Sequence, residues 1–122
     1  MVDQDPYAAV QFSANVLEAT LKAYLSYKNI EFSTTDGLLE LWKKASSAMG
    51  MRAGDLESKD LKKIVSVMNS IVDGMAHLRN NKSSAHGRTN EQVKNFTILP
   101  RHARLSINAA HTVSAYVLDV MD

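Results

Sequence analysis

The chain has 122 residues, of which 45% are hydrophobic and 22% charged, and it contains no cysteine. This length fits one folded domain and leaves no room for a second, and the composition is that of a soluble globular protein. A net charge of +1 excludes a global attraction to nucleic acid or to a membrane. Without cysteine there is neither a disulfide framework nor a Cys-ligated metal. The sequence has no signal peptide and no apolar run near the roughly 20 residues of a membrane span, so we expect a cytoplasmic protein.

The first helix should span residues 6–28, because Asp5 is a good N-cap and Pro6 suits the first helical position. Its apolar residues recur at spacings of three and four and form one buried stripe: Val10, Ala14, Leu17, Leu21 and Tyr24. A second apolar set widens this stripe and predicts more than one neighbouring helix: Phe12, Val16, Ala19 and Ala23.

A turn rich in Ser, Thr and Asp leads to a second helix over residues 38–48, where Trp42, the only tryptophan, should anchor the core. The third helix should begin after the cap Ser58 and end near Asn80. Inside it, Gly74 would admit a closely approaching neighbour. This helix has the clearest core-facing periodicity of the chain: Leu61, Ile64, Val65, Met68, Ile71, Val72, Met75 and Leu78.

Polar residues crowd into residues 81–99, and a loop of this length in a compact domain is usually functional or holds short structure, here a helical turn near residues 91–95. Thr97 should cap a last helix over residues 100–120. Its buried stripe comprises Ala103, Ile107, Ala110, Ser114, Val117 and Met121. Small residues on this helix allow a close helix contact, within the domain or with another copy: Ala109, Ala110, Ser114 and Ala115. No alternating strand pattern occurs, so the sequence predicts an all-α bundle of four main helices.

Charge is concentrated in residues 79–104, which carry a net charge of +5 with the histidines neutral, because the only acid among them is Glu91. The rest of the chain is therefore acidic overall. This segment is the candidate for contact with nucleic acid. Its basic residues are Arg79, Lys82, Arg88, Lys94, Arg101 and Arg104.

Arg79 and His86 lie seven positions apart across the expected end of the third helix. Arginine is a permanent, forked donor suited to phosphate oxygens, and histidine exchanges protons near neutral pH. Together they suffice to cleave RNA without metal: a base deprotonates the ribose 2′-hydroxyl, which attacks the adjacent phosphorus, and the arginine stabilises the charge on the phosphate. Spacing alone leaves other roles open, because an arginine at a helix end often caps carbonyls or pairs with an acid, and a loop histidine is often merely solvated.

Two short sequence runs carry a family resemblance. Arg79-Asn80, followed by five residues and His86, is similar to the R-polar-x(4 to 6)-H signature of the HEPN superfamily. Leu78-Arg79-Asn80-Asn81 with Ser84-Ala85-His86-Gly87 resembles the short C-terminal domain of abortive infection proteins, a HEPN branch. The flanks agree at Asp5-Pro6, Leu17-Glu18-Ala19-Thr20-Leu21-Lys22, Arg101-His102-Ala103-Arg104-Leu105 and Asn108-Ala109-Ala110. The similarity covers most of the chain.

The resemblance implies an antiparallel helical bundle over residues 1–122, usually a homodimer whose two motif copies meet at one composite cleft. It also implies metal-independent RNA cleavage in phage defence or toxin–antitoxin systems, with Arg79 and His86 carrying the reaction and Asn80 supporting them. No cofactor or metal ion is expected. Such a domain commonly follows a sensing or recruiting domain, so this chain is either part of a longer protein or works with a separate sensor or antitoxin.

Other residues are candidates for holding RNA phosphates: Lys82, Ser84, Arg88, Arg101 and Arg104. Turn formation explains Ser83 and Ser84 equally well. His102 and His111 lie on different faces of the last helix, which argues against a joint metal site. Three hypotheses remain: an endoribonuclease, a non-catalytic nucleotide- or RNA-binding and dimerisation module, and a purely structural bundle in which the motif ties a helix end to its loop.

Overall fold

The computed structural model describes residues 5–51, 58–80 and 97–122, and this part of the chain is helical without strands. These residues form four helices: α1 (Pro6–Tyr27), α2 (Leu38–Ala48), α3 (Lys59–Leu78) and α5 (Pro100–Met121). They pack against one another, which confirms the all-α bundle of four main helices. The functional loop expected between the last two helices lies outside the described residues. None of the described helices is both long and apolar enough to cross a membrane.

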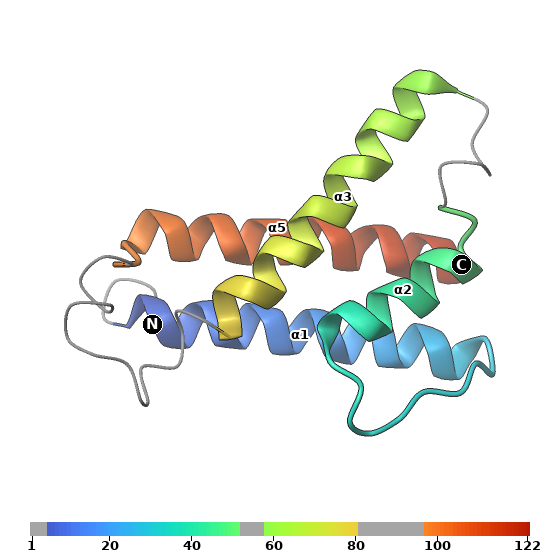
Figure 1. The fold of residues 1–122 in the computed structure, drawn as a ribbon, viewed down its shortest axis with the longest axis horizontal. Coiled ribbons are helices and arrows are strands. Elements are labelled where there is room, and N and C mark those ends of the chain that lie inside the picture. Colours follow the sequence, from blue (N-terminus) through green and yellow to red (C-terminus); the bar gives the residue numbers. More distant parts are fainter. Residues whose placement is uncertain (1–4, 52–57, 81–96) are drawn as a thin grey trace.

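Helices α1 and α5 form the centre of the bundle and lie side by side along its long axis (Figure 1). Both run in the same direction, and α3 crosses them in the opposite sense (Figure 1). Small side chains let the two axes approach: Ala14 and Ala110 are buried, and the buried hydroxyls of Ser13 and Ser106 lie 3.0 Å apart. The close contact expected from the small residues of the last helix is therefore made within the domain.

The start of α1 follows from its capping residues. The Asp5 carboxylate accepts the backbone N–H of Ala8 at 3.0 Å, and Pro6 occupies the first helical position, as the sequence predicts. The helix ends where Asn29 adopts a positive φ of 57° and the N–H of Ile30 returns to the carbonyl of Leu25 at 2.8 Å. Along α1, Tyr24 is fully buried, and this burial raises the pKa of its phenol.

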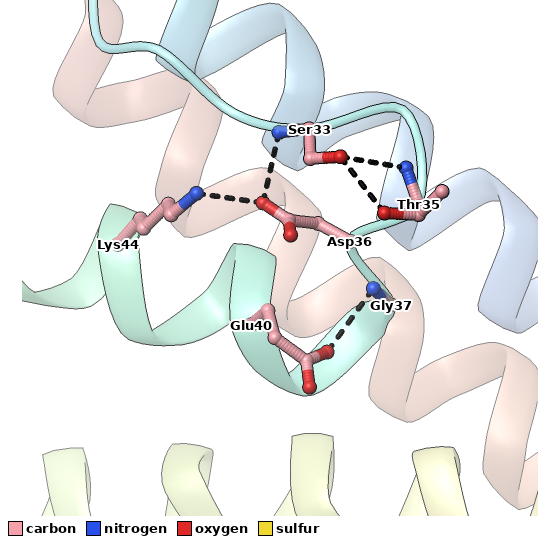
Figure 2. A network of polar contacts seen from close by, with 6 residues as sticks. All are labelled: Ser33, Thr35, Asp36, Gly37, Glu40 and Lys44. Atoms are coloured by element: carbon pink, nitrogen blue, oxygen red, sulfur yellow. Dashed lines mark hydrogen bonds and ion pairs between the residues drawn. The ribbon is translucent and has the colours of Figure 1, made fainter.

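A polar network sets the start of α2 (Figure 2). The Asp36 carboxylate accepts the backbone N–H of Ser33 at 3.1 Å and pairs with Lys44 at 2.6 Å, and both contacts lower its pKa, the bond from Lys44 most. Glu40, in the first turn, reaches back to the N–H of Gly37 at 3.0 Å. The turn between α1 and α2 is thus closed by side chains from the turn itself and from the first two turns of α2.

Trp42 ties α2 to α3. Its ring is buried, and its Nε1–H donates to Oδ1 of Asn69 at 2.7 Å. The core role expected for this residue is confirmed, with a polar contact that periodicity did not indicate.

Helix α3 touches the bundle along only part of its length (Figure 1). Val65, Met68, Val72 and Met75 are buried, as expected, but Leu61 is 46% and Ile64 is 62% exposed. The prediction that these two residues face the core is wrong, because the first turns of α3 project beyond the bundle (Figure 1). Gly74 was expected to admit a close neighbour, yet a Cβ at this position would meet nothing within 4 Å.

Helix α1 packs against α2, α3 and α5, which confirms the prediction of more than one neighbouring helix. The second apolar set of α1 contributes little to these contacts, since Phe12 is 56% and Val16 is 42% exposed. At the start of α5 the N-cap is Leu99, whose N–H donates to Nδ1 of His102 at 3.2 Å, and the expected cap, Thr97, does not occupy that position. A histidine three residues into the helix performs the role that Glu has in a capping box.

Candidate functional site

The end of α3 presents Arg79 toward α1. The backbone of Arg79 continues the helical conformation, with φ −59° and ψ −47°, and its N–H donates to the carbonyls of Met75 and Ala76. This geometry places the side chain on the part of α3 that contacts the bundle. Only 15% of the Arg79 side chain is exposed, so its guanidinium is largely removed from solvent.

Two residues of α1 hold this guanidinium. Nη1 of Arg79 lies 2.5 Å from Oε1 of Glu18 and donates to Oδ1 of Asn15 at 3.3 Å. The Glu18 side chain is only 18% exposed, so both partners of the ion pair are shielded from water and from salt. Pairing with an acid was one of the roles that spacing left open, and the structure shows that Arg79 makes such a pair.

An apolar cluster fixes the neighbourhood of this end of α3. Its buried members are Ala9, Val10, Ile98 and Ala103, with Tyr7, Leu78 and Ile107 packed against them. The cluster therefore joins the start of α1, the end of α3 and the start of α5. The hydroxyl of Tyr7 also accepts the N–H of Ile98 at 3.5 Å.

Because the start of α5 is held beside the end of α3, two more predicted phosphate-binding residues belong to the same end of the molecule. Arg101 and Arg104 are exposed on the first turns of α5 and, three residues apart, share one side of it. Ala103, between them, faces the apolar cluster. The two arginines are thus directed away from the core.

Of the five other predicted site residues, the structure describes only one. Asn80 is described and exposed at the end of α3. The remaining four, Lys82, Ser84, His86 and Arg88, lie outside the described residues. The pairing of Arg79 with His86 consequently stays a prediction.

The described histidines have positions of their own. His77 is exposed, and its Nδ1 lies 2.8 Å from the carbonyl of Asp73 one turn earlier. His102 caps α5, and His111 is exposed on the same helix. Within residues 5–51, 58–80 and 97–122, no group of three His, Cys, Asp or Glu side chains is placed to hold a metal ion.

A groove of about 790 Å³ runs between the C-terminal half of α3 and the N-terminal half of α5. Ile71, Met75 and Leu78 line it from α3, Ile98 precedes α5, and Leu105 lines it from α5. Leu105 is 67% exposed, so much of this apolar surface faces solvent. The groove reaches Leu78, the residue before Arg79.

Neither Glu18 nor Asn15 is among the site residues predicted from the sequence. One signal was present: Glu18 is the only acid in the 22 residues of α1. Glu18 lies between Leu17 and Ala19, on a helix whose only other charged residue is Lys22. This pattern favours a specific cationic partner for the carboxylate over a position on a solvated surface. Nothing in the spacing, however, identifies Arg79 as that partner.

Of the comparisons with known proteins, one identifies a family. A family model for Abi_C, described as a HEPN-like domain, matches residues 1–121. No curated protein and no solved structure matches the chain. The chain belongs to the Abi_C family of HEPN-like domains.

Proposed function

We propose that this chain is a metal-independent endoribonuclease of phage defence or toxin–antitoxin type. The observation that carries the proposal is the position of Arg79: the motif arginine stands at the end of α3, is largely shielded, and is oriented by α1. A shielded guanidinium interacts more strongly with a phosphate than one in bulk water does. The family match over residues 1–121 supports the same assignment.

In the proposed reaction a base removes the proton of a ribose 2′-hydroxyl, and the resulting oxygen attacks the adjacent phosphorus. The bond from phosphorus to the 5′-oxygen breaks, and that oxygen takes up a proton, which leaves a 2′,3′-cyclic phosphate and a 5′-hydroxyl. Arg79 stabilises the negative charge that gathers on the phosphate, and His86 transfers a proton. Since DNA lacks the 2′-hydroxyl, this chemistry selects RNA without reading bases.

One proton must be removed and another delivered, and a dimer supplies one His86 from each copy for the two transfers. The exposed groove between α3 and α5 suits the second copy, because it is apolar and ends at Leu78, next to Arg79. Arg101 and Arg104 lie at the same end of the molecule, where they would hold the flanking phosphates. A sedimentation experiment that finds only monomer, at every protein concentration and with RNA present, would contradict the composite cleft.

A non-catalytic RNA-binding module is the alternative, and the exposed Arg101 and Arg104 favour it, because phosphate binding by these residues needs no proton transfer. The two functions differ in what happens to the RNA. Binding without cleavage, weakened by the substitution Arg101→Ala, would support the module.

The test of the proposed function is RNA cleavage in the presence of a chelator, with the parent chain, His86→Ala and His111→Ala. The last variant is the matched control, since His111 is exposed on α5 and has no assigned role. We expect fragments ending in 2′,3′-cyclic phosphates from the parent and from His111→Ala, and none from His86→Ala. Full activity of His86→Ala, or cleavage that the chelator abolishes, would refute the proposal.

A further inference from the structure

Phe12 is a large apolar side chain on the exposed side of α1, and 56% of it faces solvent. It precedes Asn15 by three residues, and the Asn15 side-chain oxygen accepts a hydrogen bond from Nη1 of Arg79 at 3.3 Å. Residues three apart on a helix are surface neighbours, separated by about 4.5 Å along its axis. The phenyl ring of Phe12 and the guanidinium of Arg79 therefore flank the same asparagine.

Val16 extends this apolar surface by one turn. It follows Phe12 by four residues and is 42% exposed, so the two side chains form one patch, here called the Phe12–Val16 patch. The next two positions on this side of α1 are small, Ala19 and Ala23, so the bulky apolar surface centres on the two residues beside Asn15. Apolar surface in contact with water is unfavourable, and a ligand that covers the patch gains free energy on binding.

A nucleic-acid base suits an exposed aromatic ring that lies beside a phosphate-binding arginine. Every base has a π-face that stacks on an aromatic side chain, and this contact tolerates any base sequence. The ribose separates each base from its phosphate, so an RNA whose phosphate is held at Arg79 places a base to one side of the arginine. A protein partner would gain from covering the same patch, but that contact has no need of a neighbouring arginine.

Resting on the proposed function, we propose that Phe12 is an RNA-binding residue of the site: its ring stacks on a base of the single-stranded RNA whose phosphate Arg79 holds. Val16 contacts the edge of that base. Phe12 takes no part in the proton transfers, so it determines how tightly, and at which nucleotides, the RNA is held. Because stacking strength differs among the bases, the contact favours the larger ring system of a purine at that nucleotide.

The first experiment measures RNA binding without cleavage. The RNA is a short single strand with a 2′-O-methyl group on every ribose, which removes the attacking hydroxyl, and fluorescence anisotropy gives its Kd for the full chain. Phe12→Ala should bind this RNA about 5- to 100-fold more weakly than the parent, because the stacked ring is lost. Phe12→Tyr keeps the ring and should bind within about threefold of the parent.

The matched control is Tyr27→Ala. Tyr27 has the same exposed fraction as Phe12, 56%, and ends the same helix, far from Asn15. Its removal takes away an equally exposed aromatic ring, and we expect Kd to stay close to that of the parent. Circular dichroism and sedimentation of each variant measure its helix content and its assembly.

A second experiment removes the base instead of the ring. Each nucleotide of the 2′-O-methyl RNA is replaced in turn by an abasic one. We expect one position where this replacement weakens binding to the parent by about 5- to 100-fold and binding to Phe12→Ala by less than about twofold. At that position a purine should bind the parent more tightly than a pyrimidine does, and Phe12→Ala should lose this preference.

The outcomes separate the inference from the function on which it rests. The inference is overturned if Phe12→Ala keeps the Kd of the parent, if removing a base affects both proteins equally, or if the parent binds no RNA. It is also overturned if the parent is a dimer, Phe12→Ala is a monomer, and both respond alike to abasic RNA, because the patch then holds a second copy. Cleavage of unmodified RNA decides the proposed function independently. If the parent stacks a base on Phe12 but cleaves nothing, that function fails and the inference stands.

Discussion

The Glu18–Arg79 and Asp36–Lys44 pairs each join a carboxylate to a cation, but they connect different kinds of neighbours. Asp36 and Lys44 are eight residues apart and close the turn before α2 (Figure 2), with 39% of the Lys44 side chain exposed. Glu18 lies on α1 and Arg79 caps the C-terminal end of α3, and each is less than one fifth exposed. The first pair needs only a local turn, whereas the second exists only when the bundle has formed. Burial and a partner from another helix are what the fold adds to the motif arginine.

Replacing the arginine by lysine should have the largest effect. Arg79→Lys keeps the positive charge beside Glu18 but loses the planar fork, so the orientation that α1 imposes can no longer be passed to a phosphate. We expect kcat/KM for RNA cleavage to fall on the order of 100- to 1,000-fold. The measurement is initial-rate kinetics on a defined RNA, with circular dichroism to confirm that the variant is folded.

The matched control exchanges the same two residue types in the other pair. Lys44→Arg keeps the charge next to Asp36, and we expect cleavage within about twofold of the parent and a stability change within about 0.5 kcal/mol. Equal activity of Arg79→Lys and the parent would show that only the charge at position 79 matters.

The two pairs should differ less in their contributions to stability than in their effects on RNA cleavage. A double-mutant cycle with Glu18→Ala and Arg79→Ala should give a coupling free energy of about 1.5 to 3 kcal/mol, because a hydrogen-bonded ion pair shielded from water is lost. The corresponding cycle for Asp36 and Lys44 should give a smaller value, since Lys44 is more than one third exposed. Urea unfolding of each variant provides the free energies, and a larger coupling for Asp36 and Lys44 would reverse the comparison.

The helices themselves could be predicted because their signals are local. Asp5 with Pro6 and the hydroxyl of Ser58 set the starts of α1 and α3, and the structure shows both side chains accepting backbone N–H groups. The predictions fail where a neighbouring element decides whether a residue is buried. Periodicity shows that Ile64 and Met75 belong to one apolar pattern, but only the path of α3 determines that Met75 is buried and Ile64 is exposed.

Less of the candidate site could be predicted for the same reason. The motif identified Arg79, and the structure places it at the end of α3 as expected. Glu18 lies 61 residues earlier, and no local rule connects two positions so far apart. The His102 cap of α5 was missed because histidine is an unusual residue in that role, although Thr97 is a better capping residue by type. His86 lies outside the described residues, so its role rests on the resemblance and on the chemistry of imidazole.

The smallest expected effect is the pH dependence of the stability that Asp36 provides. Hydrogen bonds from Lys44 and from the N–H of Ser33 hold the pKa of Asp36 below its ordinary value. The folded pKa is thus lower than the unfolded one, so this carboxylate stabilises the fold above the unfolded pKa of about 3.9, and the contribution is lost as pH falls through the lower folded pKa. Asp36→Asn should therefore melt at a lower temperature than the parent at pH 6, and the difference should shrink steadily below about pH 4. Thermal melts of both proteins from pH 6 to pH 2.5 measure this difference directly, since the other carboxyl groups titrate alike in the two chains. A difference that stays constant across this range would mean that the charge of Asp36 contributes nothing, and that its carboxylate serves only as an acceptor that asparagine replaces poorly.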